Sequence, residues 1–169
     1  MAAYEVEQKF PLRRSPEEFI AGLAEFNAKS NGTVVQEDIY FSHPGRDFRE
    51  TDEALRIRSI GEQNIVTYKG PLLDETTKTR QEIEIPFDTG SHNAQQLWTM
   101  LRALGFRDVR HVRKTRQIFT AHFENREYKI AVDDVDELGR FVEVETLSDH
   151  SDWEQARDSL LKLAELLDL

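Results

Sequence analysis

An alternation of charged and apolar residues recurs in several short segments of this chain, and it constrains the fold more than any other feature. In the first segment, residues 4–10, Glu5, Glu7 and Lys9 alternate with mainly apolar residues. Successive side chains of a strand point to opposite faces, so the segment predicts a strand with one charged and one apolar face. Taken alone, it favours an amphipathic edge strand whose charged face is solvated.

The two carboxylates of this predicted strand, Glu5 and Glu7, are expected to repel each other. Positions i and i+2 of a strand lie roughly 7 Å apart. At an effective dielectric constant of about 20, the repulsion is about 2 kcal/mol. A divalent cation held by both carboxylates would offset it, and Lys9 would then contact an anion that the cation also binds.

Later segments repeat the pattern and predict further strands at residues 33–41, 54–58, 65–69, 80–85, 109–123, 128–134 and 141–145. The charged residues of these strands form one face with equal numbers of basic and acidic groups. The basic members are Lys9, Arg56, Arg58, Lys69, Arg80, Lys114 and Arg116, and the acidic members are Glu5, Glu7, Glu82, Glu84, Asp133, Glu143 and Glu145.

A charged face that recurs on so many strands points to a polar tunnel. A sheet with one solvated face is ordinary, but here the charge is too regular for that explanation alone. If helices cover the apolar outer faces and the sheet closes, the charged residues point into the lumen. Because the opposite charges nearly cancel, the lumen would accept a neutral package, such as a triphosphate with two divalent cations.

Helices are predicted in three places, which makes the fold class α+β. Ser15 and Glu18 form a capping box before a helix at residues 16–29, which Asn31-Gly32 ends. Ser91 is predicted to cap a second helix that Gly105 closes. Ser151-x-x-Glu154 is predicted to be a second capping box, before a helix whose apolar stripe packs on the sheet.

Composition narrows the class of protein. The length of 169 residues predicts a single domain, residues 1–169. The formal net charge of −10 argues against a nucleic-acid or anionic-membrane partner. The chain has no cysteine, no apolar signal region and no apolar run long enough to span a membrane, so a cytoplasmic location is expected.

These motifs resemble a known family. Glu5-x-Glu7-x-Lys9 matches the ExExK signature of the CYTH, or triphosphate tunnel, superfamily, and the resemblance continues through residues 54–58, 67–71 and 114–116 to Glu145. Residues 43–56 look most like the class IV adenylyl cyclase branch. The resemblance implies a closed antiparallel barrel of about eight strands, a nucleoside or other triphosphate as substrate, and Mg²⁺ or Mn²⁺ as cofactor. It is also compatible with a homodimer.

The resemblance also implies roles for individual residues. Arginine suits bidentate phosphate oxygens, lysine suits a point contact, and carboxylates suit a hard cation, so the residue types agree with these roles. The implied triphosphate ligands are Lys9, Arg56, Arg58, Lys69, Lys114, Arg116 and, less firmly, Arg80. The implied metal ligands are Glu5, Glu7, Glu143 and Glu145. The expected catalytic residues are Lys9, Arg56, Lys114 and Asp133, and Asp133 matches an acidic position near the metal.

The leading hypothesis is a lyase that converts ATP to 3′,5′-cyclic AMP and pyrophosphate. One alternative is a metal-dependent triphosphatase acting on thiamine triphosphate, inorganic triphosphate or a nucleotide. Another is a non-catalytic protein that binds triphosphates or polyphosphate. The recognition of a base or other organic group is expected to lie in loops whose sequence carries no readable code.

Overall fold

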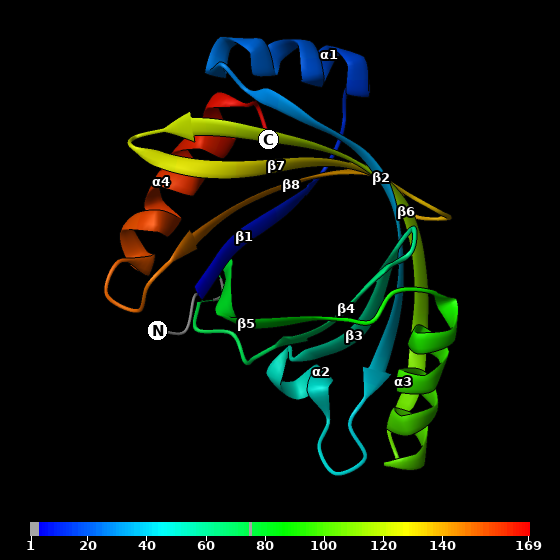
Figure 1. Cartoon of the computed structure of the whole chain (residues 1–169). Coiled ribbons are helices and arrows are strands. Elements are labelled where there is room, and N and C mark those ends of the chain that lie inside the picture. The colour runs from blue at the N-terminus through cyan, green and yellow to red at the C-terminus, as the bar shows by residue number, and fades with distance from the viewer. Residues whose placement is uncertain (1–3, 75) are drawn as a thin grey trace.

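Eight antiparallel strands close into a barrel in the computed structural model, which describes residues 4–74 and 76–169 (Figure 1). The order around the barrel is β1-β5-β4-β3-β2-β6-β7-β8, and β8 pairs with β1. This confirms the predicted closed antiparallel barrel; residues 1–3 and 75 of the predicted domain lie outside the described residues. The strands are β1 (Tyr4–Pro11), β2 (Lys29–Ser42), β3 (Ala54–Ile60), β4 (Gln63–Lys69), β5 (Lys78–Phe87), β6 (Arg107–Phe123), β7 (Arg126–Val135) and β8 (Gly139–Ser148).

The register of β1 and β8 shows how the alternating pattern directs the charge inward. Glu7 lies opposite Glu145 and Lys9 lies opposite Glu143, and all four face the lumen. The residues between them point outward, and Val6 is completely buried beneath the helices. A slip by one residue would exchange the two faces, so burial of the apolar face fixes the register.

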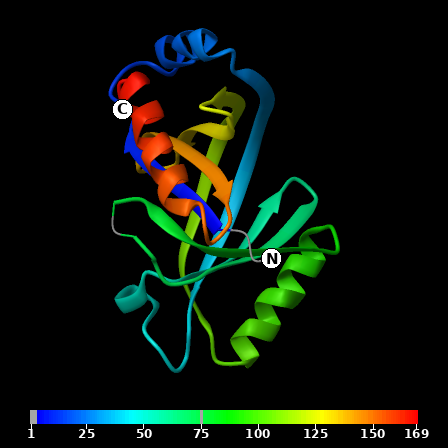
Figure 2. The same ribbon diagram turned by 90° about the vertical axis from the view of Figure 1, so that its left-hand side faces the viewer.

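Helices at two places cover the outside of the barrel (Figures 1 and 2). The helix α1 (Pro16–Gly22), the 3-10 turn η1 (Leu23–Phe26) and the helix α4 (Trp153–Leu166) lie at one end. They bury the larger core, which includes Phe19, Tyr128 and Leu160. The helix α3 (Ser91–Ala103) packs on β3 and β6 over a smaller core with Phe41, Ile57 and Leu101. A short helix, α2 (Phe48–Thr51), lies between β2 and β3.

The predicted helix at residues 16–29 is wrong in its second half. The Ser15 capping box is present, but α1 ends at Gly22 and η1 ends at Asn27, which has a left-handed φ of 51°. The chain then enters β2 at Lys29, because β6 is long enough to pair with it. Gly32 lies inside β2 at a register shift, where its φ of 98° is accessible to glycine. It therefore shapes a bulge instead of ending a helix.

The Ser15 cap is confirmed, but the helix caps predicted at Ser91 and Ser151 are wrong. The residue before α3 is Gly90, and Ser91 is already helical. Asp152 precedes α4, and Ser151 instead donates a hydrogen bond of 2.7 Å to Asp149. The predicted packing of α4 on the sheet is confirmed, because its apolar stripe is buried in the larger core. Within the described part of the chain, no helix combines the length and apolar character needed to cross a membrane.

Candidate active site in the tunnel

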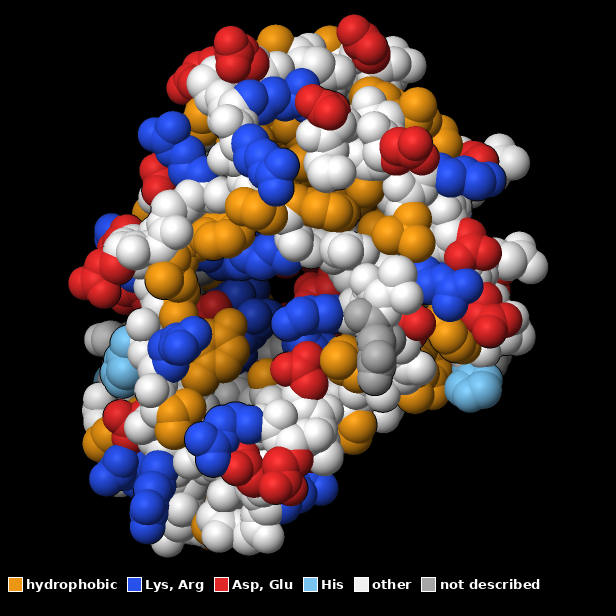
Figure 3. Space-filling model, turned by 180° about the vertical axis from the view of Figure 1, so that it is seen from behind, with side chains coloured by type: hydrophobic (Ala, Val, Ile, Leu, Met, Phe, Trp, Pro, Cys, Tyr) orange, Lys and Arg blue, Asp and Glu red, His pale blue; other side chains and the backbone are white. Residues whose placement is uncertain are grey.

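The lumen is a cavity of about 1210 Å³ lined by residues from all eight strands. Figure 3 shows it opening on the surface as a hollow bordered by charged and hydrophobic side chains. Every member of the predicted charged face lines it except Asp133, which is completely buried against Lys114 and Arg116. The alternating sequence pattern therefore located nearly all of the inward-facing charge.

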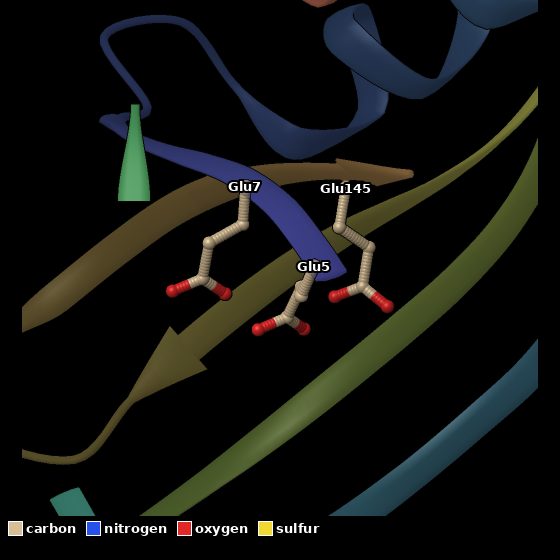
Figure 4. A group of neighbouring side chains, drawn as sticks. All are labelled: Glu5, Glu7 and Glu145. Atoms are coloured by element: carbon tan, nitrogen blue, oxygen red, sulfur yellow. The ribbon is translucent and has the colours of Figure 1, made fainter. Parts of the chain in front are cut away.

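Three of the four predicted metal ligands gather on one wall (Figure 4). Glu5 and Glu7 come from β1, and Glu145 comes from the neighbouring β8. One carboxylate oxygen from each lies within 4.8 Å of the others. Hard carboxylate oxygens at this spacing suit Mg²⁺ or Mn²⁺, so these residues fit the expected cation. We call this group the carboxylate cluster.

Lys69 places its ammonium group against the carboxylate cluster. It donates hydrogen bonds to Glu5 and, at 3.1 Å, to Glu7. Burial opposes its charge, but the Glu7 and Glu5 carboxylates raise the pKa of Lys69 above its ordinary value. Burial, and then the charge of Glu7, raise the pKa of Glu5 to about 9, although Lys69 acts in the opposite direction. Glu7 also lies 3.7 Å from Arg80, and Glu145 accepts a hydrogen bond of 2.7 Å from Lys129. A cation bound between the three carboxylates would favour the charged form of Glu5 and relieve its repulsion by Glu7.

Glu143, the fourth predicted metal ligand, lies apart from the cluster. Its carboxylate accepts a hydrogen bond of 2.9 Å from Arg116 and lies 3.7 Å from the Lys9 ammonium. Although burial acts in the opposite direction, Arg116 and then Lys114 hold the pKa of Glu143 well below its usual value. Glu143 is therefore placed to orient cationic side chains.

Two buried arginines are each paired bidentately with a buried aspartate. Arg58 donates to both oxygens of Asp38, at 2.7 and 2.6 Å. Arg116 donates to both oxygens of Asp133, at 2.7 Å each. In both aspartates burial opposes the charge, but the hydrogen bond from arginine lowers the pKa below its ordinary value. In these pairs, two hydrogen-bond donors of each arginine already have acceptors within the protein.

Lys114 shares Asp133 with Arg116. Its ammonium lies 2.9 Å from Asp133, which is completely buried. Burial, and then the nearby charge of Arg116, lower the pKa of Lys114 to about 8. Asp133 has no access to the cavity, so it acts on a ligand only through the cations that it holds.

Arg56, Arg80 and Lys9 are held more loosely. Arg56 reaches its nearest acidic groups only at 3.8 Å, and the Nε atoms of Arg56 and Arg80 are buried with no hydrogen-bond partner. Arg80 donates to the backbone carbonyl of Asp52 and lies 3.7 Å from the Glu7 carboxylate. The side chain of Lys9 is 40% exposed. These groups retain donors for a ligand, and a buried donor without a partner carries a free-energy cost that a ligand would remove.

The structure adds two kinds of residue that the sequence analysis missed. Asp38 could have been found, because it alternates with Ile39 inside the predicted strand at residues 33–41. Glu53 is a different case: it is buried and accepts hydrogen bonds from Tyr68 and Thr51 while pairing with Arg46 at 2.9 Å. Only the tertiary contacts show that it anchors residues 43–56 at the edge of the tunnel.

Known proteins resemble this chain in sequence and in fold. A protein of Methanocaldococcus jannaschii that carries the name "Putative adenylate cyclase" is 38% identical over 135 residues, covering 79% of this chain and 73% of that protein. A structure from Pyrococcus horikoshii OT3 is 36% identical, with a TM-score of 0.81, and the match covers 96% of this chain and 89% of that one.

A more distant structure shows the same fold. A "Putative adenylyl cyclase" from Hippeastrum, described as having a dominant triphosphatase activity, is 17% identical, with a TM-score of 0.65, over 98% of this chain and 88% of its own. A family model described as the CYTH domain matches residues 3–169. Because that match spans nearly the whole sequence, and the M. jannaschii relative agrees with it, this chain belongs to the CYTH family.

Proposed function

We propose that this protein is a metal-dependent adenylyl cyclase that converts ATP to 3′,5′-cyclic AMP and pyrophosphate. One observation carries the proposal: a single cavity inside the closed barrel contains both the carboxylate cluster and arginines with unpaired donors. A cation alone would leave the arginines without partners, and an anion alone would be repelled by the carboxylates. A triphosphate with bound Mg²⁺ or Mn²⁺ satisfies both groups.

The residues divide into those that contact the ligand and those that hold them. Glu5, Glu7 and Glu145 would bind the cation. The triphosphate would lie against the basic side chains of the tunnel, where Arg56, Arg80 and Lys9 offer free donors. Lys69 would also contact it, because the cation would release Lys69 from the carboxylate cluster. Arg58, Lys114 and Arg116 would present their charge to the phosphates from their buried aspartate partners.

Cyclisation needs no nucleophile from the protein. The ribose 3′-oxygen of ATP would give its proton to water and form a bond to the α-phosphorus, while the bond from that phosphorus to the oxygen bridging to the β-phosphate breaks and that oxygen leaves with pyrophosphate. The chemistry supplied by Mg²⁺ or Mn²⁺ is a lower pKa for the 3′-hydroxyl and withdrawal of charge from the α-phosphate. The basic side chains stabilise the pyrophosphate as it leaves.

A triphosphatase is the second candidate. The same tunnel could bind a terminal phosphate for attack by water, and the Hippeastrum protein combines this fold with a dominant triphosphatase activity. The relative with 38% identity carries the cyclase name and favours the cyclase. The two reactions differ in which oxygen attacks.

An ATP analogue without the 3′-hydroxyl separates these reactions. With Mg²⁺ or Mn²⁺, the protein is expected to convert ATP to cyclic AMP and pyrophosphate. It should bind 3′-deoxy-ATP competitively without consuming it, because the phosphate contacts remain and the nucleophile is missing. Release of γ-phosphate from both nucleotides at similar rates would establish the triphosphatase instead. Tight binding of ATP with no product from either would indicate a non-catalytic binding protein.

A further inference from the structure

One mouth of the tunnel is apolar, in contrast to its charged interior. Val109, Val112, Val135, Leu138 and Phe141 line the cavity at this mouth, together with the exposed Arg110. Val109 is 64% exposed and Leu138 is 61% exposed, so large apolar side chains face solvent beside a charged lumen. Inorganic triphosphate would gain nothing from such a surface, because it has no apolar part.

The sheet register shows that these residues are neighbours. Phe141 on β8 lies opposite Asp133 on β7, two residues from Val135 on the same face. Val135 lies opposite Lys114 on β6, two residues from Val112 on the same face. Residues related in this way are diagonal neighbours whose side chains are within reach of each other. Val112, Val135 and Phe141 therefore form one continuous apolar surface across β6, β7 and β8.

Lys9 connects the apolar mouth to the interior. Its ammonium lies over the Phe141 ring, 5.0 Å from the ring centre, and 3.7 Å from Glu143, so a base that stacks on this face takes the place of the ammonium. Along β8, Phe141, Glu143 and Glu145 face the lumen at alternate positions. Phe141 and Glu145 are separated by four residues, roughly 13 Å of strand. That span is comparable with the length of an extended nucleoside triphosphate.

The opposite end of the same strand face is different. Leu147 also faces the cavity and is 70% exposed, but the cavity residues beside it are polar, among them Glu127 and Lys129. An isolated exposed leucine is common on protein surfaces. The two ends of β8 therefore provide one apolar platform with an aromatic ring and one polar opening.

We propose that the apolar mouth binds the planar base of a nucleoside triphosphate, which stacks on Phe141 while the phosphates extend past Lys9 toward the carboxylate cluster. The inference rests on the proposed function, because it takes the triphosphate to lie in the tunnel. It deepens that function by naming the substrate class as nucleotides in preference to inorganic triphosphate. Stacking on an aromatic ring tolerates different bases, so Phe141 selects for the presence of a base.

Calorimetric titration with two non-hydrolysable ligands in the presence of Mg²⁺ tests the inference. Bis-methylene ATP carries the base, and imidotriphosphate does not. The wild-type protein should bind bis-methylene ATP about tenfold more tightly than imidotriphosphate, the scale of one base–aromatic stack. Phe141→Leu, which keeps an apolar side chain without a flat ring, should remove most of this difference and leave imidotriphosphate binding unchanged. Phe141→Trp should retain it.

Leu147→Ala is the matched control, because it shortens an apolar, inward-facing side chain at the other end of β8. It should leave the affinity for both ligands unchanged. If both ligands bind the wild-type protein equally, or if Phe141→Leu weakens both by the same factor, the base subsite is refuted while the proposed function stands. If neither ligand binds the wild-type protein, the proposed function fails as well.

Discussion

Two of the tunnel arginines have a bidentate carboxylate partner within the protein, and two others do not. Arg58 and Arg116 donate bidentate hydrogen bonds to buried aspartates, whereas Arg56 and Arg80 each keep a buried Nε without a partner. A buried charge that is paired within the protein is fixed in position, and removal of its partner destabilises the folded barrel. A buried donor left unpaired is available to a ligand. Residue type alone therefore does not separate binding residues from structural ones.

The carboxylates show the same contrast. Asp38 and Asp133 are each matched by an arginine, while Glu5, Glu7 and Glu145 crowd together. The two aspartates are paired without a ligand, whereas the three glutamates lie close enough together to repel one another. Crowded carboxylates and arginines with a free donor in one cavity favour a ligand that brings both a cation and an anion.

The largest expected effect is on stability. Arg58→Met should lower the free energy of unfolding by about 3 to 5 kcal/mol, because Asp38 would remain buried without its bidentate partner. Arg56→Met is the matched control, since it removes a neighbouring arginine from the same strand that lacks such a pair. Urea denaturation of the two variants in the absence of ligand measures the difference. Equal losses from both would erase the distinction between paired and unpaired arginines.

The carboxylate cluster should account for stabilisation by metal. At a Mn²⁺ concentration about 100 times the dissociation constant, binding should stabilise the wild-type protein by about 2.7 kcal/mol. Glu7→Gln should lose most of this gain, because it removes one cluster ligand. Glu84→Gln, a tunnel carboxylate on β5 outside the cluster, should keep it. Thermal unfolding with and without Mn²⁺ measures the gain, and an unchanged gain in Glu7→Gln would rule out the cluster as the metal site.

Arg56 and Arg80, which lack a bidentate partner, should contribute to affinity and affect stability less than Arg58 does. Arg56→Met and Arg80→Met are each expected to weaken binding of bis-methylene ATP by about 1.5 to 3 kcal/mol, the scale of a hydrogen bond to a charged group. Lys29→Met, which removes an exposed lysine at the start of β2, should have no effect. Calorimetry provides the affinities. The comparison fails if the lysine variant binds as weakly as the arginine variants do.

The smallest expected effect concerns Lys114. Its pKa of about 8 in the folded protein lies below the ordinary value for lysine, so it is mostly charged at pH 7 and mostly neutral at pH 9. Triphosphate affinity should therefore fall as the pH rises through 8, by less than about 1.4 kcal/mol, or tenfold. Lys114→Arg should be nearly insensitive over this range, because arginine stays charged. A wild-type affinity that is constant from pH 7 to 9 would contradict the assignment.

The inward and outward faces of the strands were predicted well because the alternation is a local property, whereas the closed eight-stranded barrel was implied by the family resemblance. Each strand carries its own inward and outward face, so Glu5, Arg56 and Glu145 could be placed in the lumen before any contact was known. The helix at residues 16–29 was misplaced because pairing with the distant β6 outweighed local helical spacing. Long-range pairing of this kind leaves no signal in a short segment.

The different roles of the individual site residues could not be predicted in the same way. Arg56 and Arg58 look equivalent in sequence, and only the position of Asp38 on the neighbouring strand separates them. Glu143 resembles Glu145 by spacing, yet its neighbours Lys9 and Arg116 give it a different role. These distinctions depend on which side chains meet across strands, and therefore on the three-dimensional structure.

A crystal structure with Mn²⁺ and bis-methylene ATP, using anomalous diffraction from manganese, tests the central claim most directly. We expect an anomalous peak between the carboxylates of Glu5, Glu7 and Glu145, with phosphate oxygens accepting hydrogen bonds from Arg56 and Arg80 and with the Arg58–Asp38 pair intact. Manganese bound elsewhere, or a triphosphate that separates Arg58 from Asp38 and leaves Arg56 and Arg80 without contacts, would contradict the account.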